Sequence, residues 1–146
     1  ICEYLADCRP AAKLWPEDPA IRAVARAVSH EMHGGFIPLR RAMPMNCRAS
    51  RPGKGTADGV ADDIARIIAI WWDCRDKFGA DGDFLFGGFT IADAMFAPIV
   101  SRLTTYGVET DPVSRRYMDA ILALLAMQEW NEAARAEPWT VEKFEI

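Results

Sequence analysis

Two histidines and a carboxylate lie within one helical turn of each other, at His30, Glu31 and His33. Histidines three residues apart could supply two ligands to a metal ion. The same helix face offers no third cysteine, histidine or carboxylate at a supporting spacing, so the sequence predicts no metal site. Glu31 is then expected to be an exposed helix carboxylate.

A stripe of mixed chemistry overlaps these histidines. Its members follow one another at helical steps of one, three and four residues: Met32, His33, Phe36 and Arg40. Two apolar side chains beside an imidazole and a guanidinium would suit a ligand with an apolar body and a negative charge. In the structural alternative, Met32 and Phe36 pack in the core while His33 and Arg40 are solvated. The sequence leaves both interpretations open.

Nucleophilic chemistry has less support. No serine lies in a nucleophile elbow, and only two histidines are present to activate one, so a self-contained hydrolytic site is not expected. The four cysteines form no C-x-x-C pair, which argues against a zinc or dithiol redox motif. Free and mostly buried thiols are typical of a reducing compartment, so the sequence predicts a cytoplasmic protein.

The elements that position these residues belong to one domain-sized chain. The sequence has 146 residues, of which 51% are hydrophobic and 26% charged, and this is the composition of an ordinary globular domain. Such a composition excludes intrinsic disorder, and no apolar run reaches the roughly 18 residues of a membrane span. The net charge of −4 gives no electrostatic reason to expect nucleic acid as a partner.

Apolar residues recur every three or four positions through most of the chain, which predicts helices. Asp18-Pro19 begins a helix that is expected to run to about residue 43, with a kink at Gly34-Gly35. Further segments are a helix at 1–9, one at 57–78, one from 90 with a kink at Pro98, one from Asp111-Pro112, one at 128–136, and a tail at 138–146 folding back through Trp139 and Phe144. Since no convincing strand is present, the predicted fold is an all-α bundle of five or six helices.

The segment around residue 90 carries the most specific motif. Thr90 and Asp93 are expected to form a capping box, in which each side chain satisfies a backbone N–H of the other's turn. Replacing either residue by alanine is expected to cost about 1–2 kcal/mol of stability. The surrounding Gly-Gly-Phe-Thr-Ile-Ala-Asp-Ala, residues 87–94, resembles the capping box that opens a buried helix in glutathione S-transferases.

Three other segments share this resemblance, so that it extends over essentially the whole chain. Residues 1–7, Ile-Cys-Glu-Tyr-Leu-Ala-Asp, resemble the end of the last helix of that family's thioredoxin-like N-terminal domain. Leu14-Trp15-Pro16, followed by Asp18-Pro19, resembles the interdomain linker and the entry to the all-α domain. Residues 31–36 together with 43–46 resemble a bacterial subgroup of the family.

The resemblance implies a division at 1–9, 10–17 and 18–146 into the end of an N-terminal domain, a linker and a C-terminal helical domain. It implies that the intact protein conjugates glutathione to a hydrophobic electrophile, as in detoxification, and forms a homodimer. The thiol-activating residue of the family lies in the N-terminal domain, so it is expected upstream of Ile1, and no catalytic residue is assigned here. The chain would supply the electrophile pocket, through Met32, His33, Phe36 and Arg40.

Other interpretations accompany the resemblance. The run from Arg40 to Lys54 has five basic residues and no acid, so it could concentrate anionic glutathione near the cleft, and a solvated loop is the competing interpretation. Glu31 could reach the glutathione amine. The same helical fold also serves in non-catalytic interaction or assembly modules. Such a module and a glutathione-dependent isomerase are the alternative functions.

Overall fold

The computed structural model describes residues 1–142 and 145, and within them the chain is helical. Its elements are α1 (Cys2–Cys8), the 3₁₀ helix η1 (Pro10–Ala12), α2 (Pro19–Gly34), α3 (Ile37–Ala42), α4 (Val60–Phe78), α5 (Ile91–Thr105), α6 (Pro112–Ala123) and α7 (Leu125–Ala136). The only extended pairings in this part of the chain are two isolated bridges, at Phe84 with Gly87 and Phe86 with Gly88. The predicted all-α class is confirmed. Phe144, where the tail is predicted to fold back, lies outside the described residues.

Aspartates begin α2 and α6 as predicted. The Asp18 carboxylate accepts hydrogen bonds from the backbone N–H groups of Ala20 (2.8 Å) and Ile21 (2.9 Å). The first turn of a helix leaves these groups without an intrahelical partner, which is why the cap stabilises it. Asp111 accepts the corresponding bonds from Val113 (2.8 Å) and Ser114 (3.1 Å) at the start of α6. Both helices therefore begin where the sequence predicts.

The predicted long helix over residues 18–43 is wrong, because it is two helices, and the bundle accordingly has one helix more than expected. α2 ends at Gly34, and Gly35 has an extended backbone, although its N–H still bonds to the Glu31 carbonyl. Phe36 then adopts a left-handed conformation with φ of 58°. Pro38 lies in the first turn of α3, where its fixed φ favours a new helix start. The glycine pair predicts only a kink, whereas the turn at Phe36 redirects the chain.

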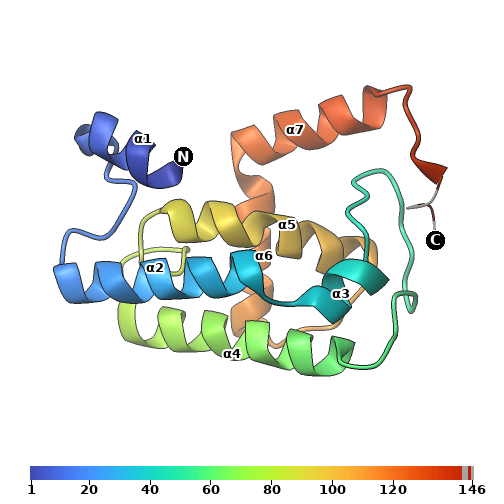
Figure 1. Cartoon of the computed structure of the whole chain (residues 1–146), viewed down its shortest axis with the longest axis horizontal. Coiled ribbons are helices and arrows are strands. Elements are labelled where there is room, and N and C mark those ends of the chain that lie inside the picture. The colour runs from blue at the N-terminus through green and yellow to red at the C-terminus, as the bar shows by residue number, and fades with distance from the viewer. Residues whose placement is uncertain (143–144, 146) are drawn as a thin grey trace.

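α5 occupies the centre of the bundle (Figure 1). It packs against α2 and α6, while α4 packs against α3 and α6. Ten of its 15 residues are buried, and the helix continues through Pro98. Ring contacts connect three helices, since Trp71 of α4 lies edge-on to Phe96 of α5 and Tyr117 of α6, with centroid separations of 6.0 and 4.9 Å. This aromatic cluster fixes the relative positions of α4, α5 and α6.

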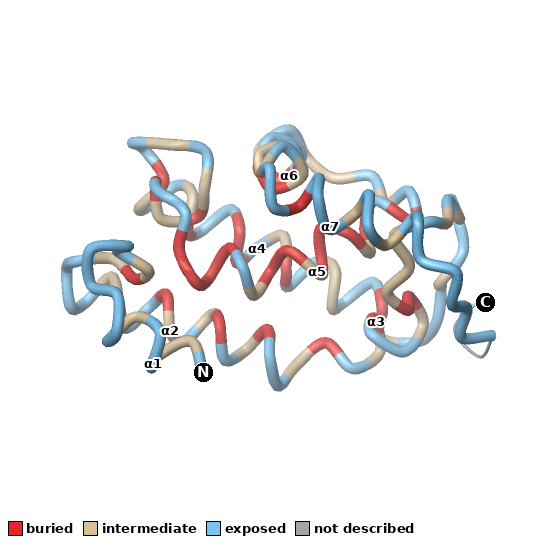
Figure 2. Tube along the Cα trace, turned by 90° about the horizontal axis from the view of Figure 1, so that it is seen from above, coloured by how far each residue is buried: buried red, intermediate tan, exposed pale blue. Residues whose placement is uncertain are grey.

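The first and last helices lie outside this core. In Figure 1, α1 and α7 are both above α2 and α5, at opposite ends of the bundle. Figure 2 shows α1 almost without buried residues, whereas buried positions recur along α2 and nearly fill α5. Met127 is the one buried residue of α7. The upper side of α2 and α5 is therefore framed by two exposed helices.

Candidate functional site

The four residues of the predicted stripe do not form one surface. Met32 and Phe36 are each 7% exposed and belong to the hydrophobic core. His33 and Arg40 are exposed and line two different concavities. The predicted shared stripe is wrong because the helix that would carry it ends at Gly34. Met32 and Phe36 therefore pack in the core, as the structural alternative for these two residues predicts.

His33 lines a cavity of about 370 Å³ between α1, α2 and the start of α5. We call it the His33 cavity. A volume of this order is in the range that proteins use to enclose small ligands. Its lining combines apolar side chains with a few polar ones, among them Trp15, Ile91 and Met95 with Glu3, His30 and His33. This combination suits a mostly apolar molecule that needs one or two polar contacts.

An ion pair connects the two helices that border the His33 cavity. Glu3 of α1 accepts hydrogen bonds from Arg26 of α2, with distances of 2.8 Å to Nε and 2.5 Å to Nη2. The hydrogen bond from Arg26 lowers the pKa of Glu3 below its ordinary value. The same guanidinium lies over the indole of Trp15, 5.7 Å from the ring centroid, in a cation–π arrangement. Arg26 thus holds α1 and the segment before α2 in place beside the cavity.

Arg40 lines a second concavity, of about 480 Å³, at α3 and the segment that follows it. We call it the arginine cleft, because Arg41 and Arg102 line it as well; its apolar lining consists of Ile37, Pro44 and Met45. The Arg40 Nη1 donates a hydrogen bond to the backbone carbonyl of His33 at 2.9 Å. The arginine cleft is therefore connected directly to the residue that lines the His33 cavity.

Arg102 is the residue of the cleft that sequence reasoning missed. It comes from α5, about 60 positions away from Arg40, and no local motif marks it. Its side chain is half-buried and anchored, since Nε donates to the Met43 carbonyl at 2.9 Å and Nη1 to the Pro98 carbonyl at 3.2 Å. Burial lowers the pKa of Arg102, and the positive charge of Arg40 lowers it further.

The predicted basic run from Arg40 to Lys54 does not act as one basic surface. Arg48 donates hydrogen bonds to the backbone carbonyls of Glu137 (3.0 Å) and Trp139 (3.1 Å). Arg51 forms an ion pair with Glu145 at 2.6 Å. Two of its basic residues therefore hold the C-terminal segment against the loop instead of facing a ligand.

Glu31 lies in an ion pair rather than at a ligand site. Its carboxylate accepts two hydrogen bonds from Arg66 of α4, at 2.7 and 2.9 Å. The hydrogen bond from Arg66 lowers the pKa of Glu31 below its ordinary value. The predicted helix carboxylate is thus partly exposed and has a partner, which links α2 to α4.

The cysteines are all free, but the expectation that most are buried is wrong. Only Cys74 is buried, and burial raises the pKa of its thiol to about 12, so it carries no reactive thiolate at neutral pH. Within residues 1–142 and 145, no three His, Cys, Asp or Glu side chains gather as metal ligands would. No helix of this part of the chain is long and apolar enough to cross a membrane.

Thr90 and Asp93 form the predicted capping box at the start of α5. The fully buried Asp93 carboxylate accepts hydrogen bonds from the Thr90 N–H (2.7 Å), the Thr90 hydroxyl (3.0 Å) and the Leu85 N–H (3.0 Å). Burial raises the pKa of Asp93, although these hydrogen bonds act in the opposite direction. The bond to Leu85 fixes the preceding loop to α5, so the motif is structural.

The arrangement of helices is shared with a known enzyme structure. No protein-family model and no curated protein matches the sequence. Among solved structures, the chain is similar to the crystal structure of glutathione transferase Omega 2C from Trametes versicolor, with a TM-score of 0.56 and 22% identity. The chain has the fold of the matched part of this glutathione transferase. The similarity covers 92% of this chain and 64% of that chain, so this chain spans less than two thirds of the transferase's length.

The His33 cavity and the arginine cleft lie on the same helical domain. Both lie along the α2–α3 segment, on a helical domain of the type that the residues at 87–94 predict. The expectation of a glutathione-transferase-like all-α bundle is confirmed. At 22% identity, this likeness concerns the fold, and function must be argued from the site.

Proposed function

We propose that the protein containing this chain is a glutathione transferase that conjugates glutathione to an electrophile with an apolar body. The observation that carries the proposal is the hydrogen bond from Arg40 to the His33 carbonyl, which connects the arginine cleft to a residue of the apolar His33 cavity on a glutathione-transferase-like fold. The two concavities offer apolar surface for the body of the electrophile. The guanidinium groups of the arginine cleft suit a negatively charged group on the same molecule.

Conjugation requires a glutathione thiolate, because the thiolate and not the thiol attacks an electrophilic carbon. A sulfur–carbon bond forms, the leaving group departs with its electron pair, and the thiol proton passes to a base. We assign activation of the thiol to a thioredoxin-like domain upstream of Ile1, with residues 10–17 as the linker and 18–146 as the helical domain. His33 and Arg40 are the proposed contacts to the co-substrate, and Met32 and Phe36 support them from the core.

We also propose that the protein is a cytoplasmic homodimer, as the resemblance to the family implies. Sedimentation of the purified protein measures the subunit number. A species with twice the monomer mass at micromolar concentration is the expected result. A monomer over the same range would contradict the homodimer without affecting the proposed chemistry.

The test is glutathione consumption by the protein isolated from its native source, with an activated aryl halide as electrophile. The expected result is turnover that saturates with both substrates, exceeds the rate without protein, and is inhibited competitively by an S-alkyl glutathione. Intact mass, measured on the same sample, determines whether a domain precedes Ile1. Absence of saturable turnover in a folded sample that carries such a domain would contradict the transferase function.

Two outcomes would instead support the alternative functions. A substrate that is isomerised while the glutathione concentration stays constant would indicate a glutathione-dependent isomerase. Retention of a protein partner after loss of all glutathione binding would indicate an interaction module, for which the exposed aromatic residues Tyr4, Trp130 and Trp139 offer contact surface.

A further inference from the structure

Three arginines line the arginine cleft, and among the described residues no carboxylate does. Arg40 and Arg41 project from α3, and Arg102 enters from α5. The other side chains that line the cleft are apolar, from Ile37, Pro44 and Met45. Among the described residues, none of the three arginines forms an ion pair. Like charges gathered in one concavity repel each other unless a counter-ion compensates them.

Several arginines elsewhere in the chain form ion pairs, unlike those of the arginine cleft. Four other arginines pair with a carboxylate at 2.5–2.7 Å: Arg26, Arg51, Arg66 and Arg115. Such pairing is expected in a chain with a net charge of −4, where acids outnumber bases by 21 to 17. In the part of the chain that the structure describes, the three arginines of the cleft thus have no carboxylate partner, although the protein has acids in excess.

The cleft is also preorganised. Two backbone carbonyls fix Arg102, at 2.9 and 3.2 Å, and the carbonyl of His33 fixes Arg40 at 2.9 Å. Backbone carbonyls are neutral partners, so they orient the guanidinium groups while leaving the positive charge uncompensated. The charged or titratable groups that influence the pKa of Arg102 are Arg40, Tyr106 and Cys47, and none of them is a carboxylate. An anion in the cleft would therefore relieve the repulsion between Arg40 and Arg102 without first breaking an ion pair.

We propose that the arginine cleft binds the carboxylate or sulfonate group of a small molecule whose apolar body lies against Ile37, Pro44 and Met45. Guanidinium groups match the planar geometry of such oxyanions, and the apolar wall adds affinity that a bare inorganic ion cannot use. This proposal rests on the proposed function in one respect. If the protein is a transferase, the organic acid bound in the cleft is its electrophilic co-substrate. The binding itself requires no glutathione chemistry.

The test compares two fluorescent probes with the same ring system, naphthalene-2-sulfonate and neutral 2-naphthol, titrated into the intact protein. We expect the sulfonate to bind at least about tenfold more tightly than the naphthol, which corresponds to roughly one charge-assisted hydrogen bond. Equal affinity for the two probes, or no sulfonate binding at millimolar concentration, would overturn the proposal. Displacement of the probe by an equal concentration of inorganic sulfate would assign the cleft to a bare anion and overturn the organic ligand.

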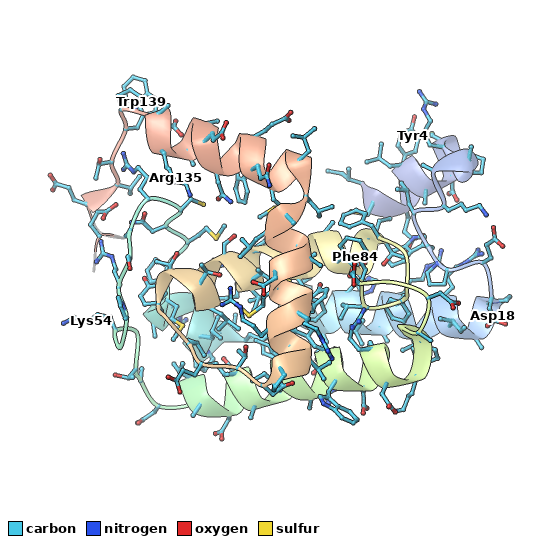
Figure 3. The ribbon with its side chains drawn as sticks, turned by 180° about the vertical axis from the view of Figure 1, so that it is seen from behind. Tyr4, Asp18, Lys54, Phe84, Arg135 and Trp139 are labelled. Carbon is cyan, nitrogen blue, oxygen red and sulfur yellow. The ribbon has the colours of Figure 1, made fainter. Side chains whose placement is uncertain are left out.

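Two variants and a control locate the binding. Within the described residues the Arg41 side chain forms no hydrogen bond or ion pair, so Arg41→Gln is expected to leave the fold intact. Arg40→Gln removes the other exposed charge of the cleft and its bond to the His33 carbonyl. Each is expected to weaken sulfonate binding about three- to tenfold while leaving 2-naphthol binding unchanged. Lys54→Gln changes the net charge equally but lies at the outer edge of the loop (Figure 3), and it should bind like the parent.

The outcomes separate this proposal from the proposed function. If all three substitutions weaken binding equally, the effect is one of net charge and the cleft is not the site. Turnover of neutral electrophiles without sulfonate binding would overturn the organic-acid site alone. Sulfonate binding that depends on Arg40 and Arg41 in a protein without glutathione turnover would confirm the cleft and contradict the transferase.

Discussion

Two carboxylates show how single residues fix the helices that frame the site. Asp93 at the start of α5 is fully buried, and burial raises its pKa. Asp111 at the start of α6 is partly exposed; burial raises its pKa as well, but hydrogen bonds from Ser114 and Val113 outweigh it and leave the pKa lowered. The same capping chemistry therefore has opposite electrostatic consequences, because the two sites differ in solvation.

Removing the Asp93 carboxylate should destabilise the fold by more than the capping box alone accounts for. We expect Asp93→Ala to lower the free energy of unfolding by about 2–4 kcal/mol, because the buried N–H groups of Thr90 and Leu85 lose their acceptor. Urea denaturation at pH 7 measures the change. Asp83→Ala, at an exposed aspartate of the preceding loop, is the control and should stay within about 0.5 kcal/mol of the parent. Equal stability of the two variants would contradict this role of Asp93.

The lowered pKa of Asp111 predicts a specific dependence of stability on pH. A carboxylate with a folded-state pKa below its ordinary value of 3.8 stabilises the fold above that pH, and the contribution disappears as the pH falls through the folded-state pKa. Asp111→Asn keeps a capping oxygen but removes the charge. We expect the parent to melt at a higher temperature than Asp111→Asn at pH 7, and the difference to shrink below about pH 4. Thermal melts at several pH values measure it; a gap independent of pH would contradict the linkage.

At the scale of elements, the junction between α2 and α3 determines the positions of His33 and Arg40 relative to each other. The turn at Phe36 separates His33 from Arg40, which the hydrogen bond from Arg40 to the His33 carbonyl then reconnects. A Cβ at residue 35 would lie 2.7 Å from the Glu31 carbonyl oxygen, whereas a Cβ at Gly34 would meet nothing within 4 Å. Only one glycine of the pair is therefore required by close approach.

Alanine substitutions of this pair should have opposite effects. We expect Gly35→Ala to destabilise the protein by about 1–3 kcal/mol, because the end of α2 must shift to accommodate the methyl group. Gly34→Ala, its matched control, should be neutral or stabilise by up to about 1 kcal/mol through its helix propensity. Denaturant unfolding of both variants measures the order. The reverse order would show that Gly34, not Gly35, is constrained.

At the scale of the whole molecule, contacts between distant segments assemble both concavities and fix the C-terminal segment. Ion pairs join α1 to α2 and α2 to α4, through Arg26 with Glu3 and Arg66 with Glu31. Arg48 reaches from the loop after α3 to the carbonyls of Glu137 and Trp139, beyond α7. In Figure 3, Trp139 lies at the far end of α7, on the side of the molecule that holds this loop. One loop residue therefore restrains residues 137–140, which follow α7.

Loss of Arg48 should release that segment without unfolding the bundle. We expect Arg48→Ala to raise the rate of chymotryptic cleavage after Trp139 about fivefold, since each lost hydrogen bond contributes about 1 kcal/mol. Cleavage within α5 should be unchanged, because its residues pack in the core. Lys54→Ala, which lies in the same loop, serves as the control. An identical cleavage rate after Trp139 in the two variants would contradict the restraint.

The sequence by itself determined the starts of α2, α5 and α6, the all-α class and the capping box, because these depend on residues within three or four positions of each other. Asp18, Asp111 and Thr90 with Asp93 lie where the local pattern predicts. The resemblance at residues 87–94 likewise predicted the glutathione transferase fold, because its motif encodes a buried helix start.

Only the tertiary structure decided what surrounds the candidate site. Helical spacing treats residues 32–40 as one helix and cannot register the left-handed turn at Phe36, which buries that residue and separates the polar pair. The arginine cleft likewise needs Arg102 from another helix, and the His33 cavity needs α1 packed beside α2. Residues far apart in sequence meet there because burying the apolar faces of the helices brings them together, and no local pattern encodes such a meeting.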